Sequence, residues 1–120
     1  MRYPILFIHG FCGSVHEYEP IVCYLKMRGC VTSYEFSYEK KFGQVSLREI
    51  AQQLNQFVRE RVGEDEFDIV ALSQGGIIAR YYIGAYSDKK VRRCITICTP
   101  HGGSLLAYVG ILPGIKELQP

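Results

Sequence analysis

Residues 67–76 read Phe-Asp-Ile-Val-Ala-Leu-Ser-Gln-Gly-Gly and pass from an apolar run to a serine followed by two glycines. The apolar run ends at Leu72, the serine is Ser73, and an apolar-periodic segment follows over residues 77–85. This order predicts a strand, a sharp turn and a helix, with the serine at the apex of the turn.

Such a turn requires small residues two positions before and two positions after the serine, because larger side chains would collide with the strand or the helix. Ala71 and Gly75 occupy these positions, so the elbow pattern G-x-S-x-G appears as A-x-S-x-G. The geometry lifts the Ser73 hydroxyl out of the sheet and places it at a helix N-terminus, which favours a developing negative charge. Two interpretations follow, a nucleophile or a serine at an ordinary strand–helix turn.

Composition bounds the class of protein. The 120 residues suffice for one domain, residues 1–120, and 48% hydrophobic against 22% charged residues indicates a globular chain. A net charge of +2 gives no argument for a nucleic-acid partner or for an anionic membrane. We expect no transmembrane segment and no secretory signal, since the apolar run over residues 4–8 is short and ends in His-Gly. The cellular location stays open.

The cysteines form no C-x-x-C pair and no His/Cys cluster with zinc spacing. They are Cys12, Cys23, Cys30, Cys94 and Cys98. We expect mainly free thiols, with disulfides or metal as the alternatives, and no metal ion or other cofactor at the site.

The other segments alternate strands with helices. Strands are expected over residues 4–8, 31–36, 69–72 and 91–98, and helices over 18–28, 46–63 and 74–86. Ser46 and Glu49 form a capping box at the start of the second helix. The alternation predicts an α/β fold with a mainly parallel sheet and helices on both faces. Active sites in such sheets lie at the carboxyl ends of the strands, where the loops after residues 8, 72 and 98 meet.

Four features together resemble the α/β-hydrolases, and more narrowly the bacterial triacylglycerol lipases. They are residues 3–10 (Tyr-Pro-Ile-Leu-Phe-Ile-His-Gly), residues 73–76 (Ser-Gln-Gly-Gly) with Ala-Arg-Tyr at 79–81, residues 99–104 (Thr-Pro-His-Gly-Gly-Ser), and the spacing between them. The resemblance covers residues 3 to about 107 and implies the N-terminal half of a three-layer α/β-hydrolase fold. The elbow also resembles palmitoyl-protein thioesterases, which likewise carry Ser-Gln-Gly, whereas Thr-Pro-His-Gly favours the lipases.

Carried over residue by residue, the resemblance implies that Ser73 is the nucleophile that attacks an acyl ester, with a lipid as the substrate. The oxyanion hole would be formed by the backbone N–H groups of Phe11 and Gln74. His9 would brace its loop together with Gly10, and Gly75 and Gly76 would complete the structural motif.

The sequence departs from the lipase pattern at the elbow and in its catalytic partners. Leu72 replaces a usual histidine and Ala71 a glycine. In this fold the triad acid and base follow on later strands, beyond a stretch that resembles residues 112–120. We therefore expect the chain to lack both groups and to hydrolyse esters weakly or not at all. The candidates for an improvised triad are His16, His101, Asp65, Asp68 and Asp88, although the resemblance gives His101 a structural role.

Three functions stay open: a carboxylic-ester hydrolase, a catalytically dead module that binds a lipid or a partner, and a thioesterase that acts on acylated protein. We also expect self-association, because the strand over residues 91–98 would have an open edge and uncovered apolar residues.

Overall fold

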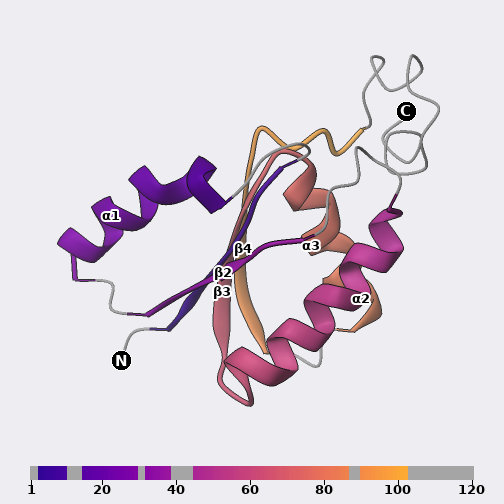
Figure 1. Cartoon of the computed structure of the whole chain (residues 1–120), viewed down its shortest axis with the longest axis horizontal. Helices are drawn as coiled ribbons and strands as arrows, with labels where there is room; N and C mark the ends of the chain where they lie inside the picture. The colour runs from indigo at the N-terminus through magenta and orange to yellow at the C-terminus, as the bar shows by residue number, and fades with distance from the viewer. Residues whose placement is uncertain (1–2, 11–14, 30–31, 39–44, 87–89, 103–120) are drawn as a thin grey trace.

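The computed structural model describes residues 3–10, 15–29, 32–38, 45–86 and 90–102 (Figure 1). In this part of the chain a single sheet contains β1 (Ile5–Ile8), β2 (Ser33–Phe36), β3 (Phe67–Leu72) and β4 (Val91–Ile97). The strand order is β2-β1-β3-β4, and every neighbouring pair is parallel. The predicted parallel sheet is confirmed, including the pairing of Ile5 to Ile8 of β1 with Asp68 to Ala71 of β3.

Helices lie on both sides of this sheet, also as predicted (Figure 1). On one side a 3-10 turn, η1 (Val15–Tyr18), leads into α1 (Glu19–Met27), and Pro20 stands in the first turn of α1, where its missing N–H costs no hydrogen bond. On the other side lie α2 (Leu47–Phe57) and α3 (Gln74–Ala85). None of the helices that the structure describes is both long enough and apolar enough to cross a membrane.

Helix α2 begins as its sequence predicts. The Ser46 hydroxyl accepts a hydrogen bond from the Glu49 N–H at 3.2 Å, which is the N-terminal half of a capping box. After Phe57 the helix widens into a π-helical turn, η3 (Val58–Val62), which the sequence analysis did not predict. Gly63 ends this turn with a φ of +75°, a conformation that glycine adopts without steric cost.

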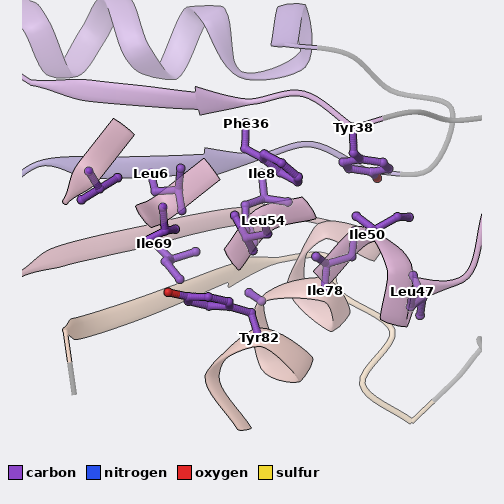
Figure 2. Close-up of a cluster of buried hydrophobic side chains, with 14 of the residues drawn as sticks. Leu6, Ile8, Phe36, Tyr38, Leu47, Ile50, Leu54, Ile69, Ile78 and Tyr82 are labelled. Carbon is purple, nitrogen blue, oxygen red and sulfur yellow. The ribbon is translucent and has the colours of Figure 1, made fainter. Parts of the chain in front are cut away.

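The main hydrophobic core lies between the sheet and the helices α2 and α3 (Figure 2). Leu6 and Ile8 of β1 point into this core, whereas Phe7 between them packs with Tyr18 and Val22 on the side of α1. Side chains of successive strand residues point to opposite faces, so the unbroken apolar run of β1 is explained by burial on both faces.

Strand β4 is the least covered strand. Among the described strands it pairs with β3 alone, and Ile95 is 56% exposed. Val70, which pairs with Ile95 from the neighbouring strand β3, is 8% exposed, so burial of the side chains falls sharply from β3 to β4. Self-association through this edge stays a prediction.

Candidate active site

Ser73 joins the end of β3 to the start of α3 and has an unusual backbone conformation. Its φ is +51° and its ψ is −122°, although it is not a glycine. A non-glycine residue held in such a region costs about 1–3 kcal/mol, and strain of this kind clusters at functional sites. The side chain is exposed and stands at the N-cap of α3. The residue with the strained backbone thus carries a solvent-accessible hydroxyl.

Three hydrogen bonds hold Ser73 in this conformation. Its N–H donates to the Ile97 carbonyl at 2.8 Å, and its carbonyl accepts from the Gly76 N–H at 3.0 Å and from the Thr99 hydroxyl at 2.8 Å. Ile97 ends β4, and the next residue, Cys98, also has a positive φ, +54°. The end of β4 therefore fixes the turn at the end of β3.

The two glycines after Ser73 allow α3 to approach its neighbours closely. A Cβ on Gly75 would lie 2.6 Å from the carbonyl oxygens of Ile8 and His9, and a Cβ on Gly76 would overlap the Thr99 side chain. Real Cβ atoms do not approach backbone oxygens so closely, so position 75 requires glycine. The first turn of α3 lies directly against the carboxyl end of β1.

The segment after β1 also reaches Ser73. A Cβ on Gly10 would lie 3.1 Å from the Ser73 Cβ and 3.7 Å from its Oγ, which places the Gly10 backbone beside the serine. The Gly10 N–H donates to the Oε2 of Glu17 at 2.9 Å. Glu17 was not a candidate in the sequence analysis, because an isolated glutamate near a helix start gives no signal of a contact seven residues back.

His9 is fully buried and lies beneath this segment. Its Nδ1 is 2.9 Å from the Gly10 carbonyl, which can only accept, so Nδ1 carries the proton. Its Nε2 then accepts a long, 3.5 Å hydrogen bond from the Tyr38 N–H. Tyr38 stacks on the imidazole with ring centroids 4.1 Å apart and donates its hydroxyl to the His9 carbonyl at 3.0 Å. Tyr38 lies just after β2, and nothing in the sequence marked it as a candidate for the site.

Gln74 is the first residue of α3 and is 2% exposed, and its role as an oxyanion donor stays a prediction. Phe11, the other expected oxyanion donor, lies outside the described residues. No side chain in the described part of the chain hydrogen-bonds the Ser73 hydroxyl.

The histidines considered for a triad face other partners. The exposed His16 has its Nδ1 2.7 Å from the Oε1 of Glu19. The Nδ1 of His101 accepts from Arg80 at 3.2 Å, so its Nε2 carries the proton and donates to the Thr96 hydroxyl at 3.0 Å.

The aspartates do not meet Ser73 either. Asp68 pairs with Arg92 at 2.6 Å near the amino end of β3, the edge opposite Ser73. Asp65 lies in the turn before β3, and Asp88 lies outside the described residues. The described part of the chain thus brings none of the triad candidates to the serine hydroxyl.

Tyr18, which follows Glu17, anchors η1 in a smaller core on the α1 side of the sheet. This smaller core consists of the buried side chains of Phe7, Tyr18, Val22 and Val70. It is fully buried and stacks on Phe7 with ring centroids 5.1 Å apart. Burial raises the pKa of Tyr18 well above its usual value, and the carboxylates of Glu35 and Glu17 raise it further. The phenol therefore stays protonated, and its hydroxyl has no hydrogen-bond partner in the structure described.

No cluster of three or more metal-ligating side chains occurs among the described residues. Cys23, Cys94 and Cys98 have free thiols, whereas Cys12 and Cys30 lie outside the described residues. The described part of the site is thus built from a strained serine, the hydrogen bonds that hold its turn, and three close-packed glycines.

Comparison with known proteins identifies the family of this chain. Residues 4–109 match the family described as palmitoyl protein thioesterase. A search of curated proteins gave no match.

Solved structures show the same fold. Phospholipase PlaB from Legionella pneumophila, in complex with thio-NAD, superposes with a TM-score of 0.88 at 19% identity, over 98% of this chain and 31% of its own. The Bacillus licheniformis lipase BlEst2 gives 0.80 at 22% identity, over 98% of this chain and 55% of its own. A monoacylglycerol lipase from Paleococcus ferrophilus gives 0.71 at 19%, over 88% and 45%. The likeness confirms the predicted α/β-hydrolase fold, and the chain spans 31% to 55% of the length of these structures.

Proposed function

The chain belongs to the palmitoyl protein thioesterase family, and from this premise we propose that it is a serine hydrolase of lipid acyl esters with Ser73 as its nucleophile. The observation that carries the proposal is the positive φ of Ser73 at the apex of the strand–helix turn. A serine that only ended a strand would not need a conformation that costs free energy. Three hydrogen bonds and two close-packed glycines maintain this conformation, which supports a role for the exposed hydroxyl.

In the proposed reaction the Ser73 hydroxyl transfers its proton to a base, and its Oγ bonds to the acyl carbon. The bond from the acyl carbon to the leaving group then breaks, and the leaving group takes up the proton. Water hydrolyses the acyl–serine ester, which releases the fatty acid and restores the hydroxyl. The negative charge on the acyl oxygen would be stabilised by the backbone N–H groups of Gln74 and Phe11.

The first turn of α3 supports this oxyanion assignment on the Gln74 side. The N-terminus of a helix carries the positive end of the helix dipole. Gln74 directly follows Ser73 and begins α3, which runs for three turns to Ala85. Developing negative charge beside Ser73 would therefore meet a favourable field.

The base and the acid that orients it are proposed to lie outside the described residues. The imidazoles of His9 and His101 each have both ring nitrogens engaged elsewhere, and His16 is paired with Glu19. In well-studied triads a protein without its base keeps a residual of roughly 10³–10⁴ over water. We therefore expect these 120 residues to be weak catalysts when expressed alone.

A thioester is the second candidate substrate, because the matching family consists of palmitoyl protein thioesterases and residues 73–75 carry the Ser-Gln-Gly that prompted this alternative. The chemistry at Ser73 would be the same, except that a carbon–sulfur bond breaks. Comparing the rates on a palmitoyl thioester and on a glyceride ester of matched chain length separates the two substrates.

A fluorophosphonate probe tests the nucleophile itself. We expect labelling at Ser73, located by peptide mass spectrometry, and no labelling of Ser73→Ala. The control is Ser37→Ala, which removes another exposed serine and should label normally. A protein that carries its base and is still not labelled at Ser73 would contradict the proposal and favour the catalytically dead binding module.

A further inference from the structure

Glu17 touches the site through a contact that the chemistry above does not use. Its carboxylate accepts the Gly10 N–H at 2.9 Å, and the Gly10 backbone lies against the Ser73 side chain. Two contacts therefore connect a glutamate on η1 to the proposed nucleophile. We propose that Glu17 is a positioning residue that holds Gly10 at its distance from Ser73, an inference that rests on the proposed function.

Gly10 benefits from such a partner because the other hydrogen bonds that fix it, among the described residues, come from one side. The His9 imidazole holds the Gly10 carbonyl at 2.9 Å, and Tyr38 holds the His9 carbonyl at 3.0 Å. These contacts come from the buried side of the loop. The contact recorded for the Gly10 N–H is the one with Glu17. Glycine has the widest choice of backbone conformations, so losing this bond frees a rotation that other residues would not permit.

A small movement of Gly10 matters because there is little space between it and Ser73. Even a Cβ, one atom, would come within 3.1 Å of the Ser73 Cβ and within 3.2 Å of the Leu72 carbonyl oxygen. Movement toward the serine would push on its side chain, and movement away would remove this contact. Misplacement of reacting groups by about 1 Å can lower rates by roughly 10²-fold.

Glu17 suits this role because the backbone that carries its exposed side chain is anchored by the next residue. The next residue, Tyr18, is fully buried and stacked on Phe7, so η1 cannot shift without disturbing the smaller core. A carboxylate also accepts stronger hydrogen bonds than a neutral group does. Glu19 provides the contrast, because it lies two residues further on and pairs with His16 at the exposed surface.

The test compares Glu17→Ala, Glu17→Gln, Glu19→Ala and Ser73→Ala in hydrolysis of p-nitrophenyl butyrate by a protein that carries its base. We expect Glu17→Ala to lower kcat by about tenfold or more with KM nearly unchanged, because the bond positions reacting groups. Glu17→Gln should recover most of this loss, since its amide oxygen still accepts the Gly10 N–H. Glu19→Ala should behave as wild type.

Hydrogen exchange at the Gly10 amide gives a second readout that needs no activity. In ¹⁵N-labelled protein we expect faster exchange in Glu17→Ala and unchanged exchange in Glu19→Ala. Wild-type kcat in Glu17→Ala would overturn the inference, as would equal losses in Glu17→Ala and Glu17→Gln that follow a common drop in thermal stability. If Ser73→Ala keeps full activity, the proposed function fails, and Gly10 exchange then decides by itself whether Glu17 holds this loop.

Discussion

Beneath α2 and α3, Leu54, Ile69 and Ile78 are fully buried in a cluster of apolar side chains, whereas at the carboxyl ends of β1 and β3 the chain places a strained serine and a buried histidine. The apolar cluster is built for stability, because each side chain removes apolar surface from water. The turn at Ser73 lowers stability, because a positive φ costs free energy in a residue other than glycine. The close contacts at the glycines also restrict which residues can stand there. This contrast indicates that substitutions in the two regions should affect different properties.

The largest effect on stability is expected for Leu54→Ala in the core. Leu54 is fully buried in α2, and such truncations cost about 2–5 kcal/mol because they leave a cavity. Denaturant unfolding measures this loss, while labelling of Ser73 per folded molecule should be unchanged. Gln53→Ala, on the exposed side of the same helix, should stay within about 0.5 kcal/mol of wild type. A Leu54→Ala protein with normal stability but poor labelling of Ser73 would contradict the expectation that the core affects stability and the turn affects labelling.

The next effect is expected for Gly75→Ala at the turn. The new methyl group would meet the carbonyl oxygens of Ile8 and His9, so α3 must move away from β1. Overpacking of this kind costs about 1–3 kcal/mol, and here it should also abolish labelling of Ser73. Gly84→Ala in the same helix is the matched control, since a Cβ there meets no atom. It should raise stability by about 0.5–1 kcal/mol and leave labelling intact.

Replacing Ser73 separates the cost of its conformation from the role of its hydroxyl. Ser73→Gly and Ser73→Ala both remove the hydroxyl, but only glycine adopts a φ of +51° without strain. The free energy of unfolding should therefore be about 1 kcal/mol higher for the glycine variant than for the alanine variant. Thermal or urea unfolding of the two variants measures the difference. Equal stabilities would mean that the turn stores no strain.

The smallest effect is expected for Tyr18→Phe in the smaller core. The Tyr18 hydroxyl is buried and has no partner among the described residues, so its removal should stabilise the fold by about 1 kcal/mol. The raised pKa also sets a pH dependence. The phenol ionises near pH 10 in the unfolded state and only at higher pH in the folded state. Above about pH 10 the unfolded state therefore binds fewer protons than the folded state, and the free energy of unfolding falls as pH rises. Tyr18→Phe should lack this part of the alkaline decline in unfolding measurements at a series of pH values.

Local signals in the sequence were sufficient for the fold. The unbroken apolar run of β1 and the capping box at Ser46 predicted buried parallel strands and the start of α2, because each signal depends on neighbouring residues. The contacts between Glu17 and Gly10 and between Tyr38 and His9 could not be predicted. They join a polar or aromatic residue of ordinary type to a backbone group, and only the folded chain brings the two together.

The role of Thr99 falls between these cases. Thr99 was quoted as part of a motif, yet its hydrogen bond to the Ser73 carbonyl depends on the register between β3 and β4 and on the turn at Cys98. The strain at Ser73 has a similar origin. The small residues around the serine predicted a sharp turn, but the sign of φ becomes visible only in the structure.

Detection of an acyl–enzyme tests most directly the claim that the strained turn exists to present a nucleophile. A protein that carries its base is mixed with p-nitrophenyl butyrate, quenched in acid and examined by intact-mass and peptide mass spectrometry. The account predicts a butyryl adduct on Ser73 that is absent from Ser73→Ala and that forms normally in Gly84→Ala. An adduct on another residue, or hydrolysis at the wild-type rate by Ser73→Ala, would contradict it.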